Sequence, residues 1–234
     1  MNSLNQKEHN TFQFQAHITT GNVENLTDYI ALCETCKVKP VLIKLAKGNF
    51  VNQPMYTQNL VAERLDDVML EVERVKKVFT ENGFLIIRTK IEINAEQVID
   101  YFQIDVTQWE NRQYREHCIE QFQGSYFEVH IKVKYNDLDL LKEIAIKNNL
   151  YLSQNDREPG IRFLSVRKNL ADALNLVGED GFELRTYHLH EKNLSRAFEQ
   201  DLKAAHMEIV KEKYECCIYD SNQKLDSNWG FHEI

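Results

Sequence analysis

The chain has 234 residues, of which 36 are acidic and 28 basic, giving a formal net charge of −8. Its 43% hydrophobic content is ordinary for a globular protein, and the acidic excess argues against general binding to nucleic-acid backbone. No stretch approaches the ~20 apolar residues of a membrane span. The polar start MNSLNQKEHN lacks the apolar core of a signal peptide, so we expect a cytoplasmic protein without membrane contact.

Strand and helix patterns alternate from residue 12 onward. Residues 12–20 (FQFQAHITT) alternate apolar and polar residues with the period of two that is typical of a half-buried strand. Helical spacing follows over 22–37 and 65–82, with strand-like runs at 39–46 and 54–62 between these helices. The segment 81–93 (ENGFLIIRTKIEI) then predicts a strand that begins after a helix end at Gly83. The order is β-α-β-β-α-β.

The same order is expected from residue 125 onward. Residues 125–135 (SYFEVHIKVKY) match the first strand, and 179–190 (EDGFELRTYHLH) match the last one, with Gly181 in the place of Gly83. The patterns between them predict a helix at 136–149, strands at 150–154 and 161–168, and a helix at 170–180. Further helices are expected from 95 to about 118 and over 194–213, the latter followed by a short strand, YECCIYD.

These landmarks predict an α+β fold made by tandem duplication of ferredoxin-like βαββαβ units with antiparallel sheets. Each unit would place both helices on one face of its own sheet and leave the other face open. The expected division is a first unit at 11–94, a helical connection at 95–124, a second unit at 125–193, and a C-terminal helix, strand and tail at 194–234.

Side chains alternate across a strand, so the polar residues of each first strand face away from the helices. His17 and His130 then occupy equivalent positions on the open faces. The last strand of each unit neighbours the first, which places cations beside each histidine. The residues expected beside the histidines, in a cleft suited to an anion such as phosphate, are Arg88, Lys90, Arg185 and Tyr187.

The motifs HITT and HIKV, at matching places in a duplicated unit, resemble the His-x-Thr motifs of the two-histidine phosphoesterases. That resemblance implies metal-independent cleavage or formation of nucleotide or RNA-end phosphoesters, with no cofactor. It implies His17 and His130 as general base and general acid, with Thr19 on the phosphate. The second motif departs from the family pattern, because Lys132 stands where a threonine or serine is expected, and the resemblance then implies that Lys132 binds the phosphate by its charge.

Other functions remain open on the sequence alone. The alternative to a phosphoesterase is a non-catalytic protein that uses the paired sheets to bind a ligand or another protein. The pair Cys33 and Cys36 is compatible with half a zinc site or a redox pair, and His188 with His190 is compatible with a metal pair. The five cysteines, an odd number, favour reduced thiols, and no metal is expected.

Overall fold

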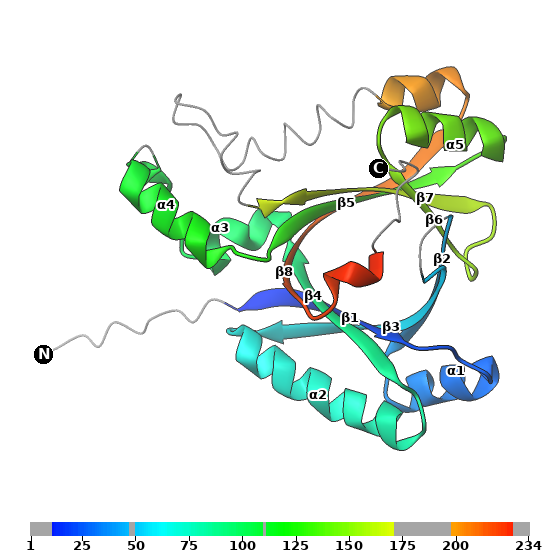
Figure 1. The fold of residues 1–234 in the computed structure, drawn as a ribbon, viewed down its shortest axis with the longest axis horizontal. Helices are drawn as coiled ribbons and strands as arrows, with labels where there is room; N and C mark the ends of the chain where they lie inside the picture. The colour runs from blue at the N-terminus through cyan, green and yellow to red at the C-terminus, as the bar shows by residue number, and fades with distance from the viewer. Residues whose placement is uncertain (1–10, 47–49, 110, 171–197, 227–234) are drawn as a thin grey trace, which may run out of the picture.

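The computed structural model describes residues 11–46, 50–109, 111–170 and 198–226. Within these residues, antiparallel strands close into one barrel in the order β1-β3-β2-β6-β7-β5-β8-β4 (Figure 1). The strands are β1 (Phe12–Thr20), β2 (Lys39–Leu45), β3 (Asn52–Ala62), β4 (Ile86–Asn94), β5 (Tyr126–Lys134), β6 (Tyr151–Asn155), β7 (Ile161–Asn169) and β8 (Glu208–Asp220).

Helices lie on the outside of this wall. In Figure 1, α1 and α2 cover the part of the barrel built by β1–β4, and α5 covers the part built by β5–β7. The α-helices are α1 (Leu26–Thr35), α2 (Leu65–Glu81), α3 (Val98–Tyr101), α4 (Arg112–Gln121) and α5 (Leu138–Lys147), and residues 198–204 are also helical. Short 3-10 turns occur at η1 (Ala95–Gln97), η2 (Val106–Gln108) and η3 (Gln223–Asp226).

The hydrophobic core lies between the barrel wall and these helices. In β1, Phe14, Ala16 and Ile18 are buried on the outer side of the wall, and Val72 and Phe79 of α2 belong to the same core cluster. A second cluster around Ile131 and Leu141 fills the corresponding space beneath α5. The predicted alternation of β1 and β5, with the apolar side under the helices, is confirmed. The polar sides consequently point into the barrel.

The expectation of a tandem repeat of ferredoxin-like units with separate open sheets is wrong. β2 pairs with β6 over Ile43–Leu45, and β4 pairs with β8 from Lys90 to Asn94, so the chain forms a single closed sheet. An open sheet leaves edge strands with unpaired backbone groups, and these two pairings satisfy them. Local patterns specify strands but carry no signal for joining their edges, which is why the sequence did not reveal the closure.

The last quarter of the chain also differs from expectation. A helix was predicted over 194–213, but β8 begins at Glu208, six residues before the YECCIYD segment, and ends with that segment at Asp220. β8 is the neighbour of both β5 and β4. The strand predicted within 179–190 lies outside the described residues, together with Arg185, Tyr187, His188 and His190.

No helix in the described part of the chain combines the length and the apolar character needed to cross a bilayer.

Candidate functional site

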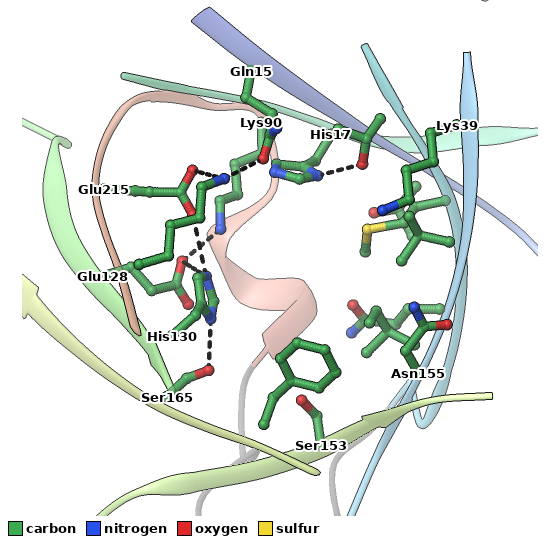
Figure 2. Close-up of a pocket in the computed structure, with 18 of the residues that line it drawn as sticks. Gln15, His17, Lys39, Lys90, Glu128, His130, Ser153, Asn155, Ser165 and Glu215 are labelled. Atoms are coloured by element: carbon green, nitrogen blue, oxygen red, sulfur yellow. Dashed lines mark hydrogen bonds and ion pairs between the residues drawn. The ribbon is translucent and has the colours of Figure 1, made fainter. Parts of the chain in front are cut away.

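The barrel encloses a polar cavity of about 420 Å³ (Figure 2). Every second residue of the strands lines it, as the strand alternation requires. The lining side chains include Gln15, His17 and Thr19 of β1, Arg88 and Lys90 of β4, Glu128, His130 and Lys132 of β5, and Lys211, Lys213 and Glu215 of β8. The open faces that were expected to hold the two histidines are therefore one interior, and both histidines share it.

The two sides of the cavity differ in chemistry. Strands β1, β4, β8 and β5 are consecutive around the barrel and carry the ionisable groups named above. The side formed by β3, β2, β6 and β7 mixes apolar groups with polar ones that, apart from Lys39, are uncharged; the apolar groups are Val41, Ile43, Leu45, Met55 and Phe163. A molecule bound here would meet a charged wall and a mostly uncharged wall of mixed polar and apolar groups.

His17 is engaged at both ring nitrogens. Its Nδ1 lies 2.9 Å from the hydroxyl of Thr57, which is its direct cross-strand partner on β3. Its Nε2 lies 2.9 Å from Oε2 of Glu92 on β4. Burial lowers the pKa of His17 and outweighs the opposing effect of the Glu92 carboxylate, so the ring is held neutral.

His130 is placed in the corresponding way on β5. Its Nδ1 lies 2.7 Å from the hydroxyl of Ser165, again its direct cross-strand partner. Its Nε2 is 3.8 Å from Glu128 and 3.9 Å from Glu215, beyond hydrogen-bond distance from either. Burial lowers the pKa of His130, against the opposing attraction of Glu128. Nε2 of His130 is therefore less engaged than Nε2 of His17.

Three buried carboxylates stand beside the histidines. Lys90 pairs with Glu92 at 2.6 Å and also contacts Glu128. Burial opposes ionisation of Glu92 and Glu128, yet neighbouring cations hold both pKa values below the usual range. Glu215 is different, because burial and the nearby Glu92 raise its pKa to about 8. Two groups of side chains have metal-ligand character: His17 with Glu92 and Glu215, and His130 with Glu92 and Glu128.

Like charges face one another across β5 and β8. Glu128 is directly opposite Glu215, and Lys132 is directly opposite Lys211, with His130 opposite Lys213 between them. Like charges in directly opposed positions destabilise a sheet, and the pKa of about 8 for Glu215 avoids this beside the ionised Glu128 because Glu215 is then mostly protonated at pH 7. The barrel interior thus has an acidic level, formed by Glu128 and Glu215, and a basic level, formed by Lys132 and Lys211, four residues apart along β5.

The cations predicted to bind phosphate are placed unequally. Arg88 is the cross-strand partner of Thr19, and Lys90 of His17, as expected from adjacent first and last strands. Arg88 is buried and pairs with two aspartates, Asp220 and Asp226, at 2.5 Å and 2.8 Å. Lys132 pairs with the partly exposed Glu158 at 2.6 Å. Arg88 therefore has the character of a structural group, whereas Lys132 remains at the cavity surface.

Several lining residues escaped the sequence prediction. Lys211, Lys213 and Glu215 were assigned to the end of a helix or to a short strand, and their spacing of two was the signal that marked them as one face of β8. Lys39 at the start of β2 was taken only as part of a strand. Among the described residues, Lys39 and Lys211 have no carboxylate within ion-pair distance, and both are exposed, which marks an open end of the cavity.

The Cys33–Cys36 pair lies apart from the cavity. Cys33 is buried in the outer core beneath α1, and burial raises the pKa of its thiol to about 12. A thiol that resists ionisation is a poor nucleophile and a poor metal ligand. Its environment agrees with the apolar helix face on which it was predicted.

Comparison with known proteins adds no assignment to this geometry. No protein-family model matches the chain, and a search of curated proteins finds no significant match.

Proposed function

We propose that the barrel cavity binds a small phosphorylated molecule and that His130 transfers a proton at its phosphoester. The observation that carries the proposal is the placement of Lys132 directly opposite Lys211, with His130 two residues along the same face of β5. An anion between the two ammonium groups would compensate the charge of Lys211, which has no carboxylate partner among the described residues, and would join or replace Glu158 at Lys132. Phosphate is an anion of suitable charge for such a pair.

The cavity supports the same choice by its size and its second wall. A volume of about 420 Å³ falls within the ~300–1,000 Å³ typical of small-molecule sites. Met55 and Phe163 offer an apolar surface that suits the base or another apolar part of such a ligand. A mononucleotide or a short RNA end combines both features.

His130 is the group that we assign to proton transfer. With Ser165 accepting from Nδ1–H, the lone pair of Nε2 faces the cavity and can accept a proton from an attacking hydroxyl. Lys132 and Lys211 would then stabilise negative charge that develops on the phosphoryl oxygens. His17 is less suited to this role, because both of its ring nitrogens are engaged.

The test is turnover of 2′,3′-cyclic nucleotides and 2′–5′-linked oligonucleotides by the full chain, its His130→Ala variant and its Lys211→Met variant. His117→Ala on the exposed side of α4 is the matched control. We expect loss of His130 to lower turnover by ~10²–10⁴-fold, the range for a general acid–base group. Turnover that survives in His130→Ala would contradict the assigned role.

Binding without catalysis is the second candidate function, and the engagement of His17 at both nitrogens is the observation that favours it. Calorimetric titration with the same nucleotides separates the two. Binding that weakens in Lys211→Met, without turnover in the wild type, supports the binding protein. The absence of both binding and turnover would contradict both candidates.

A further inference from the structure

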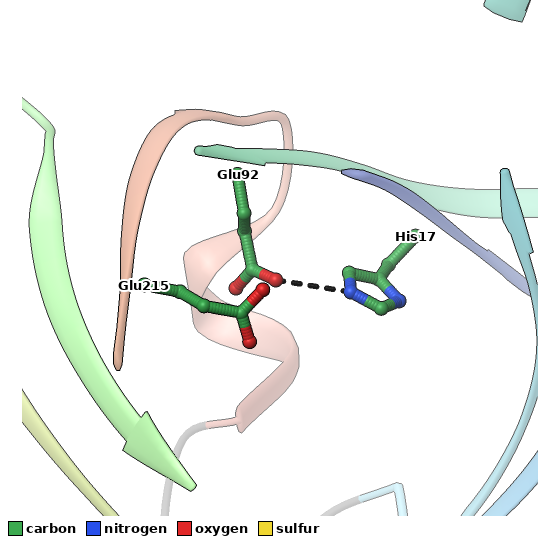
Figure 3. Close-up of side chains that lie close together, drawn as sticks. All are labelled: His17, Glu92 and Glu215. Carbon is green, nitrogen blue, oxygen red and sulfur yellow. Dashed lines mark ion pairs between the residues drawn. The ribbon is translucent and has the colours of Figure 1, made fainter. Parts of the chain in front are cut away.

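We infer that His17 and Glu215, which line the cavity, and the buried Glu92 beside them form a binding site for one divalent transition-metal ion at the acidic level of the barrel interior. The three side chains come from the neighbouring strands β1, β4 and β8 and converge on one point (Figure 3). One potential ligand atom from each lies within 4.8 Å of the other two. The sequence analysis expected no metal, so this proposal replaces that expectation.

The spacing of the first two ligands already suits a metal ion. Nε2 of His17 and Oε2 of Glu92 are 2.9 Å apart. Adjacent donors on an octahedral ion with bonds near 2.1 Å are separated by about 3 Å. A modest movement of the Glu215 side chain would bring its carboxylate into the same coordination sphere.

Glu92 is a buried carboxylate whose environment suits a cation better than a proton donor. It is inaccessible to solvent, and neither of its oxygens makes a hydrogen bond of good geometry to another described residue. Its contacts are ion pairs by distance, with Lys90 on Oε1 and His17 on Oε2. A metal ion in place of the Nε2 proton of His17 would bind Oε2 of Glu92, and an ionic contact depends less on direction than a hydrogen bond does.

Lysines orient both carboxylates without covering the atoms that face the site. Lys90 contacts Oε1 of Glu92, and Lys213 contacts Oε1 of Glu215 at 2.5 Å. Oε2 of Glu92 is left on the His17 side, and Oε2 of Glu215, which has no lysine contact, lies 3.9 Å from Nε2 of His130. These lysines would hold the ligands in place and limit the net negative charge.

The imidazole of His17 is supported as metal-bound histidines usually are. Such histidines have the second ring nitrogen hydrogen-bonded, which fixes the orientation of the ring. Here the hydroxyl of Thr57 is in place on Nδ1, and Nε2, which contacts Oε2 of Glu92 at 2.9 Å, would bind the ion after losing its proton. Imidazole nitrogen together with carboxylate oxygen selects Mn²⁺, Fe²⁺, Co²⁺ or Zn²⁺ over a purely oxygen-bound Ca²⁺.

The experiment is a titration of the chelator-treated full chain with Co²⁺, followed by its visible absorption and by calorimetry. We expect one equivalent to bind with a new absorption band. Glu215→Gln and His17→Gln should each weaken binding by more than the ~10–100-fold that loss of a supporting group typically causes. Glu208→Gln, an exposed position on the same strand, is the matched control and should bind as the wild type does.

Circular dichroism of each variant separates loss of the site from loss of the fold, and Glu215→Gln is the more informative variant because it keeps the shape of the side chain. A wild type that binds neither Co²⁺ nor Zn²⁺ would overturn the inference. Equal affinity in the wild type and a folded Glu215→Gln variant would also overturn it, since the ion would then lie elsewhere.

Discussion

Arg88 and its acidic partners form a buried ion network at the barrel wall. Asp220 accepts hydrogen bonds from Arg88 and from Tyr126, and Asp226 pairs with both Arg88 and Arg167. Burial disfavours the charge of Asp220, but these hydrogen bonds hold its pKa below the usual value. A carboxyl group with a lowered pKa stabilises the folded state above its unfolded pKa, and that contribution is lost as the pH falls through the folded value.

We therefore expect Asp220→Asn to lower the free energy of unfolding at pH 7 by about 3–5 kcal/mol, because it leaves Arg88 with one acidic partner in a buried site. Urea unfolding at a series of pH values from 7 to 3 measures this. The difference between variant and wild type should shrink toward pH 3, as the wild-type carboxyl becomes protonated. Asp66→Asn, in an exposed pair with Arg64, is the control and should change stability by less than ~0.5 kcal/mol.

Lys211 allows a prediction of opposite sign. Because it faces Lys132 across β5 and β8, we expect Lys211→Met to raise the free energy of unfolding of the ligand-free protein by about 0.2–1 kcal/mol. The same change should weaken phosphate-ester binding. Thermal unfolding with and without nucleotide measures both effects, with Lys44→Met, an exposed lysine of β2, as control. Lower stability of the ligand-free variant would show that the lysine repulsion is already relieved.

At the scale of the element, α2 is attached to the barrel by one apolar stripe. Val68, Val72, Val75 and Phe79 are its buried residues, at the spacing that a helix of 3.6 residues per turn requires. Phe79 is fully buried and stacks on Tyr56 of β3 with ring centroids 4.3 Å apart. This contact joins the helix to the outer surface of the wall.

We expect Phe79→Ala to destabilise the protein by about 3–5 kcal/mol, through lost burial and the cavity that remains. Leu70→Ala on the exposed side of the same helix, where the side chain is 73% exposed, should cost less than ~0.5 kcal/mol. Chemical denaturation of both variants gives the comparison. Similar losses in the two would mean that the helix contributes by its own propensity rather than by packing.

The elements with strong local periodicity were predictable from the sequence, and β8 was not. Strand β1 and helix α2 each bury one face against a core, and that face is visible as a period of two or of 3.6. In the first part of β8, EIVKEK, the side chains that face the cavity are the charged Lys211 and Lys213. Lys and Glu also favour helices. The inward face of β8 therefore lacked the apolar signal that reveals a strand.

The residues of the candidate site were predictable where their strand was predictable. His17 and His130 were found because strand alternation places them opposite an apolar face, and the structure brings both to one cavity. Lys211 and Glu215 were missed together with their strand. The pairing of Glu128 with Glu215 depends on the register between β5 and β8, which no local pattern contains.

At the scale of the whole molecule, the ladders between neighbouring strands of the barrel differ in length. β2 pairs with β6 over Ile43–Leu45 only, whereas β5 pairs with β8 over the whole of Tyr126–Lys134. A short ladder has fewer hydrogen bonds to break, so local opening costs less there. The β2–β6 ladder, together with the equally short β6–β7 ladder, is therefore a weak part of the wall.

Hydrogen exchange followed by mass spectrometry should reveal this difference. We expect amides of β2 near Ile43 to be protected at least ~10-fold less than those of β5 near Ile131, which corresponds to about 1.4 kcal/mol in opening free energy. Strand β1, paired along its length with both β3 and β4, serves as a second well-protected reference. Uniform protection around the barrel would show that the wall opens as one cooperative unit.

The position of the hydrophobic core outside the wall has a consequence for how this protein can change. The apolar side chains whose burial stabilises the strands, such as Ile18 and Phe79, lie between the wall and the helices. The side chains that line the cavity contribute little to this buried apolar surface. Lining residues of β2 and β3 that lie outside the core clusters, such as Val41 and Met55, can therefore be exchanged without emptying the core. The barrel is a scaffold whose ligand preference can evolve, or be redesigned, while its architecture is preserved.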